Sequence, residues 1–466
     1  MMRERLPDTP YVVTVIGGGF SGLLTAIHLL RDHRGVRVRL VEKRERLGEG
    51  RAYGASSPDH LLNVRAANMS AFPDRPRHFL QWLGEEEAAD AFVSRSRYAE
   101  YLQSLLTAEL QDLEAGQRFS RKWGQAVEAT PVEGRWRVRL ACGHAFYADA
   151  VILAVGFTPP AWPAGIAGDI PANPRFVADP WSHDLSVLPP GDLLLLGTGL
   201  TMVDMALTLA RPGRRLTALS RRGLVPLGHG PAPAAPPPAA PMRSPARALA
   251  ALRSHAASVG WRSAVDSIRP VTTALWQRWT EADRARFLRH LQPWWDIHRH
   301  RMAPIVAERI GSMRDSGLLD VQAGRLEAVH AIDGGLVEAV IRPRGQARAV
   351  SQRFAAVINC ASLQVDSGAW RDGLMAGLHA QGLLRADSLR LGLDVDGALR
   401  VIGADGRPSP GLYAVGPLTR AAFWEAVAVP DLRGQTALAA RAVLLDLNKR
   451  GGRASLDRFG FRLNRR

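Results

Sequence analysis

Apolar residues form a nearly continuous run close to the start of the chain, and the spacing of apolar positions then lengthens. Residues 11–16 are mostly β-branched or aromatic, which is typical of a strand buried on both faces of a parallel sheet. Glycines follow, and residues 23–33 place apolar side chains at helical spacing. After a turn at Arg34 and Gly35, residues 36–42 alternate and then become apolar, as in a second strand. The order predicts a strand–helix–strand unit of the length that dinucleotide-binding folds need.

The same order returns in residues 192–223, where an apolar strand, a glycine turn, a helix and a second strand follow one another. At some distance after each unit come two short strand-like segments and a buried strand that ends in small residues. They lie within 125–156 in the first half and within 325–362 in the second. A repeated order of this kind predicts an internal duplication of architecture. The alternative is the general likeness of any two α/β segments.

The segment between the second unit and its closing strands has a different pattern. Residues 231–241 read PAPAAPPPAAP, which favours an extended linker or surface loop. Residues 244–317 are rich in Arg, Ala, Leu and Trp at helical spacing. We therefore expect a helical insertion in the second nucleotide-binding domain.

The predicted fold class is α/β, with two Rossmann-like dinucleotide-binding domains, one for FAD and one for NAD(P)H, and a helical insertion. Both domains are expected to be discontinuous in sequence. The expected divisions are an FAD-binding domain at 1–160 and 363–466, the latter ending in a basic tail, an NAD(P)-binding domain at 161–225 and 318–362, and the Pro-rich linker with the helical insertion at 226–317.

Three glycines in the first turn, Gly17, Gly19 and Gly22, follow the order G-x-G-x-x-G. In dinucleotide folds the first allows the tight turn, the second lets the pyrophosphate approach the backbone, and the third lets helix and strand pack closely. The helix N-terminus behind them is an anion site. Glu42 ends the following strand, where a carboxylate accepts the ribose hydroxyls of adenosine and repels a 2′-phosphate. The motif predicts FAD or NAD, and the alternative is that the glycines serve only the turn.

The second turn matches the motif at Gly197 and Gly199, while Met202 occupies the third glycine position. Its partner strand ends without an acid and continues into Arg221 and Arg222. Cationic side chains at this place hold a 2′-phosphate, which predicts NADPH. NADH is the alternative cofactor, and solvated turn residues are the alternative role for the arginines. Two such sites in one chain imply hydride transfer from a nicotinamide to a flavin.

Arginine dominates the basic residues. Lys and Arg number 60 against 44 Asp and Glu, which gives a formal charge of +16, and all but three of the basic residues are arginine. They are scattered along the chain and no nucleic-acid-reading motif is present, so we expect no nucleic-acid partner. Arginine also suits phosphates and small anions.

The two cysteines, Cys142 and Cys360, lie far apart and in no metal-ligand spacing. This argues against a disulfide framework or a metal site and favours a reducing cytoplasm. The longest apolar tract, residues 193–210, contains two glycines and Asp204 and falls short of a membrane span. We therefore expect no membrane anchor, and the sequence leaves the oligomeric state open.

On these motifs the sequence resembles the flavoproteins with two dinucleotide-binding domains. It is more closely similar to a bacterial FAD/NAD(P)-binding flavoprotein family that includes an FAD-dependent urate hydroxylase. The resemblance runs along nearly the whole chain. The segments that carry it are 15–22 (VIGGGFSG), 48–83, 195–204 (LLGTGLTMVD), 294–304 (WWDIHRHRMAP) and 415–435.

The resemblance implies that residues 48–53 and 60–70 wrap the FAD, with Asn63 and Met69 near the flavin. Gly416 and Pro417 stand where many such flavoproteins have glycine and an aspartate that contacts the ribityl chain, so we expect a backbone contact there. Trp424 and Glu425 are expected on the helix that follows. The other expected cofactor-binding residues are Phe20, Ser21 and Lys43, beside the glycine motif and Glu42, together with Val127 and Gly156.

Oxygenation is the flavin reaction that the sequence favours. Disulfide reductases need a C-x-x-C pair beside the flavin, and the chain has none. Residues 176–183 (FVADPWSH) come near the F-x-G-x-x-x-H fingerprint of one monooxygenase group, but Ala178 replaces the glycine and His183 lies one position late. We expect an FAD-dependent monooxygenase that uses NAD(P)H and O2 and is only distantly related to that group.

The resemblance puts urate first among substrates, since urate is a flat anion that arginine and tryptophan would bind. Within WWDIHRHR the expected catalytic residues are His298, His300 and Arg301. A histidine would take a proton from urate, and the products would be 5-hydroxyisourate and water. His298 and His300 face different ways on a helix, so only one can serve.

Three alternatives stay open. WWDIHRHR can be an amphipathic helix that ends in solvated His and Arg side chains. A second enzyme reading is N-hydroxylation of an amine, which also needs two nucleotide sites. The chain can also be a redox-sensing protein whose flavin binds without turning over.

Overall fold

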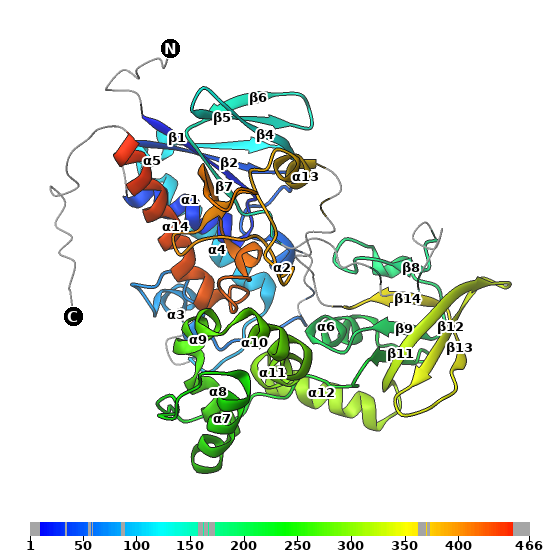
Figure 1. The fold of residues 1–466 in the computed structure, drawn as a ribbon. Coiled ribbons are helices and arrows are strands. Elements are labelled where there is room, and N and C mark those ends of the chain that lie inside the picture. The colour runs from blue at the N-terminus through cyan, green and yellow to red at the C-terminus, as the bar shows by residue number, and fades with distance from the viewer. Residues whose placement is uncertain are drawn as a thin grey trace.

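The fold is described from a computed structural model. The structure describes residues 10–32, 35–54, 57, 59–84, 89–156, 162, 166, 173–361, 370 and 373–450. Figure 1 shows two sheet-based domains and a group of helices that lies below the first domain and beside the second.

The first sheet has six strands, all parallel to their neighbours except one edge pair. They are β1 (Tyr11–Ile16), β2 (Val36–Glu42), β3 (Phe119–Trp123), β7 (Ala150–Leu153), β15 (Arg400–Ile402) and β16 (Pro408–Ala414). Their order is β15-β16-β7-β1-β2-β3, and the antiparallel pair is β15 with β16. Strands from both ends of the chain therefore share one sheet.

Both faces of this sheet are covered, which explains why its central strands are apolar throughout. Alternate residues divide between two cores: Val13 and Val15 join one, and Val151 and Leu153 join the other. The first face packs against α1 (Phe20–Asp32), α4 (Arg95–Leu110) and α14 (Val429–Arg450). The second packs against α13 (Gly373–Ala380) and a meander of β4 (Ala126–Val132), β5 (Arg135–Leu140) and β6 (Ala145–Ala148). Shorter elements are α2 (Gly50–Tyr53), η1 (Ala66–Asn68), α3 (His78–Leu83), α5 (Leu113–Arg118) and η7 (Gly416–Thr419).

The second sheet repeats this arrangement. Its strands are β8 (Phe176–Val177), β9 (Leu193–Leu196), β10 (Leu216–Ser220), β11 (Leu319–Ile332), β12 (Leu336–Pro343), β13 (Val350–Phe354) and β14 (Ala356–Asn359). Their order is β13-β12-β11-β10-β9-β14-β8. One face packs against α6 (Leu200–Leu209) and α12 (Pro304–Asp315). The short η3 (Leu185–Val187) precedes β9.

Equivalent strands and hydrogen bonds relate the two sheets. β1 lies between β2 and β7, as β9 lies between β10 and β14, and all four pairs are parallel. The N–H of Gly17 donates to the carbonyl of Val41 at 2.9 Å, and the N–H of Gly197 donates to the carbonyl of Leu219 at 2.8 Å. The predicted fold class, α/β with two Rossmann-like domains, is confirmed.

The helical insertion follows the Pro-rich residues 231–241, which form neither helix nor strand. Its first helix is capped by the Ser244 hydroxyl, which accepts the N–H of Arg247, and has Pro245 at its first position. The elements are α7 (Pro245–Val259), α8 (Trp261–Ser267), η4 (Arg269–Val271), α9 (Thr272–Arg278), α10 (Glu281–Arg286), the π-helical η5 (Phe287–Leu291) and α11 (Gln292–Arg299). α12, which the sequence pattern groups with them, instead packs on the second sheet.

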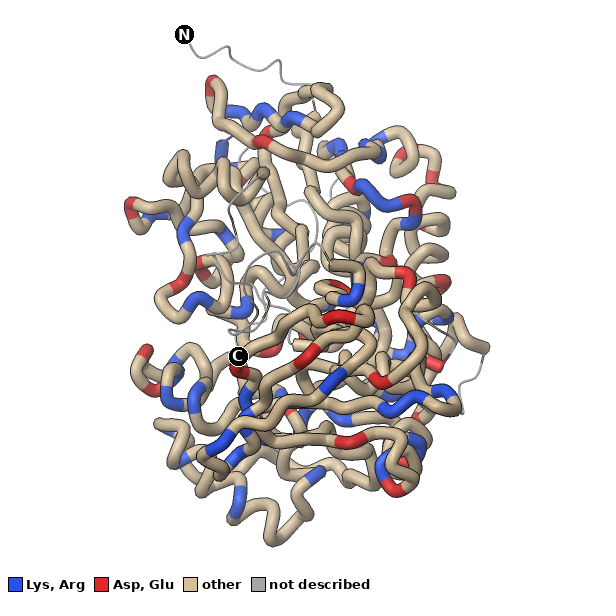
Figure 2. The backbone as a smooth tube through the Cα atoms, turned by 90° about the vertical axis from the view of Figure 1, so that its right-hand side faces the viewer, with Lys and Arg blue, Asp and Glu red and all other residues tan. Residues whose placement is uncertain are grey.

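The expected domain divisions stay predictions, because the boundaries after residues 160 and 362 lie outside the described residues. Charges of both signs are interspersed over the two domains, as Figure 2 shows. In the described part of the chain, no helix is long and apolar enough to cross a membrane. Within the same ranges, no three His, Cys, Asp or Glu side chains are grouped to hold a metal ion.

Candidate functional site

The first glycine turn leaves no room for a side chain at two of its glycines. Gly17 has a φ of +106°, and a Cβ there would lie 2.3 Å from the carbonyl oxygen of Ala154. A Cβ on Gly22 would lie 1.8 Å from the carbonyl oxygen of Gly17. Only glycine lets α1 start this close behind β1, so that the helix N-terminus faces the end of the sheet as an anion site.

Glu42 lies at the end of β2, beside this turn. One carboxylate oxygen accepts the N–H of Gly18 at 2.7 Å, and the other accepts the N–H of Arg44 at 2.9 Å. These bonds fix the carboxylate at the edge of the turn, where the adenosine ribose lies in dinucleotide-binding folds. Lys43 is exposed.

Two further segments close on the first turn. The N–H of Gly48 donates to the carbonyl of Gly18 at 2.7 Å, and a Cβ on Gly19 would lie 3.3 Å from the Cα of Gly50. On another side, a Cβ on Gly416 would lie 2.8 Å from the Oγ of Ser21. Segments far apart in sequence therefore meet around the start of α1.

The second glycine turn has the same geometry. Gly197 has a φ of +115°, and a Cβ there would lie 2.5 Å from the carbonyl oxygen of Cys360. Gly199 caps α6, and a Cβ on it would meet nothing within 4 Å. Met202, at the third glycine position, is buried. Within the described part of the chain, nothing therefore closes off the N-terminus of α6 at Gly199.

The end of β10 differs from the end of β2 in charge. Ser220 accepts the hydroxyl of Thr198 at 2.9 Å, which fixes the turn. Arg221 is exposed, and Arg222 is half-buried with a guanidinium N–H 3.5 Å from the carbonyl of Arg289. Ser220 thus stands where the first domain has Glu42, and two arginines follow it.

Buried polar contacts tie the two domains together. Arg95, the first residue of α4, pairs with Asp204 of α6 at 2.8 Å, and the His60 ring nitrogen lies 2.8 Å from the hydroxyl of Thr208. Burial raises the pKa of Asp204, and the Arg95 guanidinium opposes this shift. Sequence reasoning missed this contact, although an acid in the middle of the apolar stretch LTMVDMALTL is its signal.

The segment 60–70, expected around the FAD, lies partly at this junction. The carbonyl of Asn63 accepts the His229 ring N–H at 3.0 Å, and burial lowers the pKa of His229 to about 4. Met69 lies in the core of the first domain, and its carbonyl accepts the Tyr98 hydroxyl at 3.0 Å. The structure therefore brings Asn63 to the linker that leads from the second domain to the insertion, and leaves Met69 among apolar neighbours.

The C-terminal segment presents its glycine to a side chain of its own domain. The N–H of Gly416, followed by Pro417 in η7, donates to the Gln435 side chain at 2.7 Å. The expectation that Trp424 and Glu425 lie on the following helix is wrong, because α14 begins only at Val429. Pro430 fits the first turn of a helix, and this sets the later start.

The remaining expected cofactor residues lie near the first sheet. Phe20 is buried and stacks on Tyr98, with 6.4 Å between ring centroids. Gly156 follows β7 with a φ of +73°. Val127 is half-buried in β4.

The three expected catalytic side chains point to three different places. His298 lines a cavity within the insertion, and its Nδ1 donates to the carbonyl of Trp294 at 2.8 Å. His300 ends α11, and burial lowers its pKa to about 4. Arg301 is 2% exposed and pairs with Asp266. Of the three, only His298 faces this cavity.

A buried charge cluster joins the insertion to the first domain. Glu425 is 2% exposed, accepts the Trp295 indole N–H at 3.1 Å and lies 3.3 Å from the Arg299 guanidinium. Burial opposes the ionisation of Glu425, but Arg299 and the Trp295 N–H outweigh it and lower its pKa. Burial raises the pKa of nearby Asp296 to about 6. The adjacent Trp424 stacks on Trp276 with 4.5 Å between centroids.

Comparison with known proteins identifies the first domain. The FAD-NAD(P)-binding family matches residues 14–158, which include the first glycine turn, Glu42 and β7. This part of the chain is therefore an FAD/NAD(P)-binding domain. The 3-dehydro-bile acid delta(4,6)-reductase of Clostridium scindens is 30% identical over 158 residues. The match covers 31% of this chain and only 38% of that protein.

Solved structures share the fold along almost the whole chain. The ornithine N-hydroxylase of Kutzneria sp. 744, in a structure with reduced FAD, NADP⁺ and L-ornithine, has a TM-score of 0.65 at 13% identity, covering 94% of this chain and 99% of its own. The L-lysine 6-monooxygenase of Pseudomonas syringae has a TM-score of 0.62 at 16% identity, covering 95% and 99%. The arrangement of two dinucleotide-binding domains in one chain is thus the fold of these enzymes.

Proposed function

We propose that the chain is an FAD-dependent monooxygenase that consumes NAD(P)H and O2. The observation that carries the proposal is the repetition of one glycine turn, called a glycine cradle below, at 17–22 and 197–202. Glu42 ends the adjacent strand in the first copy, and Arg221 and Arg222 follow that strand in the second. A carboxylate there suits an unphosphorylated ribose, and arginines suit a 2′-phosphate. The pair is therefore suited to FAD and NADPH.

The first cradle fits FAD on its own geometry. Gly17 and Gly22 let α1 begin directly behind β1, where a Cβ would collide with backbone, and the Glu42 carboxylate is held beside this turn. In the proposal the N-terminus of α1 holds the pyrophosphate and Glu42 holds the ribose. When bound, FAD supplies hydride acceptance from a nicotinamide and electron transfer to O2.

The second cradle fits a nicotinamide dinucleotide. None of the described residues closes off Gly199 at the N-terminus of α6, which would take the pyrophosphate. Arg221 and Arg222 would hold a 2′-phosphate. The ion pair of Arg95 with Asp204 would keep the start of α6 aligned with the first domain.

We further propose N-hydroxylation of an amine as the reaction. Urate is the first expectation from the sequence, but the solved structures that share the fold along the chain include an ornithine N-hydroxylase and a lysine monooxygenase. This likeness favours an amine over urate.

Spectroscopy and oxygen uptake test the function. Purified full-length protein should contain bound FAD, and anaerobic addition of NADPH or NADH should bleach it. In air, one member of a panel of primary amines should accelerate oxygen uptake and be converted to a hydroxylamine.

Three outcomes contradict parts of the proposal. Flavin-loaded protein that neither cofactor reduces supports a redox sensor. Oxygen uptake that yields only hydrogen peroxide with every amine contradicts N-hydroxylation. Urate consumption coupled to NAD(P)H oxidation restores urate as substrate.

A further inference from the structure

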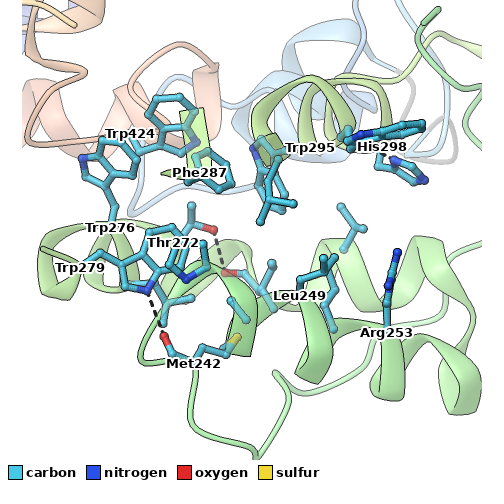
Figure 3. A pocket seen from close by; sticks show the side chains of 18 of the residues that line it. Met242, Leu249, Arg253, Thr272, Trp276, Trp279, Phe287, Trp295, His298 and Trp424 are labelled. Atoms are coloured by element: carbon cyan, nitrogen blue, oxygen red, sulfur yellow. Dashed lines mark hydrogen bonds between the residues drawn. The ribbon is translucent and has the colours of Figure 1, made fainter. Parts of the chain in front are cut away.

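The helical insertion contains a cavity of about 450 Å³ that lies apart from the two glycine cradles. Its volume is within the range of small-molecule sites, about 300–1,000 Å³. Helices α7, α8, α9 and α11 and the turn η5 supply most of its lining, and Trp424 from the C-terminal segment contributes at one end (Figure 3).

The walls near that end are mainly apolar. The indole N–H groups of Trp276, Trp279 and Trp295 donate to other protein oxygens, at 2.7, 3.1 and 3.1 Å. The hydroxyl of Thr272 donates to the carbonyl of Ile268 at 2.9 Å. A polar group placed here would lose its water and gain few partners, so the buried part of a ligand must be mainly apolar.

The opposite end is basic. Figure 3 shows Arg253 and His298 together at the end away from Trp424. The Nδ1–H of His298 is bound to a carbonyl, which leaves Nε2 for a ligand. Among the described residues that line the cavity, none is Asp or Glu. An ammonium group would therefore lack an ionic partner, whereas a carboxylate would meet Arg253.

We propose that this cavity binds an amphipathic carboxylate, with its apolar chain against Trp276 and Trp424 and its carboxylate at Arg253 and His298. The proposal goes beyond the oxygenation reaction and does not depend on it. It also excludes a small free diamine from this cavity, so the amine of the proposed reaction would bind elsewhere.

Titration of flavin-loaded, full-length protein with short carboxylates tests the proposal. Decanoate should bind at one site, measured by calorimetry and by a change in tryptophan fluorescence. Octanoate, two methylenes shorter, should bind about 15-fold more weakly, because each buried methylene is worth about a fourfold change in affinity. Decylammonium should bind more weakly than decanol, because its charge faces Arg253.

Two variants locate the ligand. Leu249→Trp fills the lining next to the aromatic wall and should abolish decanoate binding. Arg253→Gln should weaken decanoate about two- to fivefold and leave decanol unchanged, because Arg253 is exposed and its ion pair is solvent-screened. Arg247→Gln, on the same helix but outside the lining, should change neither.

Several results overturn the proposal: no saturable binding, equal affinity for octanoate and decanoate, or tighter binding of decylammonium than of decanoate. The proposal is also wrong if the Arg253→Gln variant binds decanoate as tightly as the unmodified protein. Because Arg253 is exposed, this variant should fold and keeps the test valid even if Leu249→Trp does not fold. If the unmodified protein is a dimer that binds no decanoate, and Leu249→Trp dissociates this dimer, the surface instead contacts a second copy of the chain. FAD content is read separately by absorbance, so loss of flavin contradicts the proposed function and leaves the cavity test intact.

Discussion

The two glycine cradles have the same backbone geometry, but they differ in charge and in the segments that cover them. In both, the first glycine has a φ above +100° and faces the carbonyl that follows a neighbouring strand, that of Ala154 in one and Cys360 in the other. The first cradle has Glu42 at its strand end and is covered by residues 48–50. The second has Ser220 at its strand end, followed by two arginines, and none of the described residues covers Gly199.

This difference separates the features that the fold requires from the features that can vary without changing the fold. A Cβ at the first glycine would collide with the sheet in either domain, so glycine is required by packing alone. Packing does not determine the charge at the strand end or the covering loop. The closed cradle suits a cofactor that stays bound, and the open cradle suits one that exchanges during turnover.

Replacing the first glycine of either cradle should have the largest effect. Gly17→Ala adds strain and a collision with backbone, so we expect it to lower the free energy of unfolding by at least about 3 kcal/mol and to abolish FAD binding. Gly197→Ala should lose bleaching by NADPH while folded molecules keep their FAD. Thermal unfolding, flavin absorbance and anaerobic reduction measure these outcomes.

Gly84 provides the control for this pair. It has a φ of +72°, but a Cβ there meets nothing within 4 Å, so Gly84→Ala adds strain without collision. It should cost about 1–2 kcal/mol and leave both cofactors bound. If Gly17→Ala were no worse than Gly84→Ala, the collision argument for the cradles would fail.

Removing the interdomain ion pair should have the next largest effect. Arg95→Ala leaves Asp204 buried without its cation, which costs about 3–5 kcal/mol. Burial raises the pKa of Asp204 in the folded state, so the folded protein holds its proton to higher pH than the unfolded chain. The cost of Arg95→Ala should therefore grow as pH rises and shrink in acid.

Urea unfolding of Arg95→Ala at several pH values measures this trend. Arg97→Ala, two residues along on the exposed side of α4, is the matched control and should change stability by less than about 1 kcal/mol. A cost for Arg95→Ala that does not change with pH would contradict the assignment to the charge of Asp204.

Local sequence patterns predicted the cradles, because the strand, the spaced glycines and the helix of each turn follow one another directly in the sequence. The segment WWDIHRHR was harder, since adjacency in sequence does not determine direction. His298 faces the cavity, whereas Arg301 is buried against Asp266. The sequence prediction placed all three expected catalytic side chains in one site, whereas the end of the helix directs them to different places.

Contacts between distant segments were beyond sequence reasoning. Trp424 was expected on the helix after Gly416 and Pro417, but it precedes that helix and stacks on Trp276 in the insertion. The cavity forms where several short helices and this C-terminal residue meet, and no periodicity in any one of them shows it. The Arg95–Asp204 pair likewise needs the two domains to be docked.

Changing the acid of the first cradle should have a moderate effect. Glu42→Gln removes a charged acceptor while keeping its shape, so we expect FAD to bind about 10- to 100-fold more weakly. Glu45→Gln, exposed and three residues on, is the control and should leave FAD affinity unchanged. Equal FAD affinity in both variants, measured by fluorescence titration of the apoprotein, would contradict a ribose contact.

Changing the arginines of the second cradle should have the smallest effect, but it tests the difference between the two cradles most directly. Arg221 and Arg222 lie near the surface, so solvent screens their attraction for a phosphate. Replacing both with alanine should raise the KM for NADPH about tenfold and that for NADH less than about twofold, because only NADPH carries the 2′-phosphate. Arg211→Ala, exposed beyond the far end of α6, is the control. An equal rise in the KM values of both cofactors would mean that these arginines do not contact the 2′-phosphate. The charge difference between the cradles would then no longer explain which cofactor each one binds.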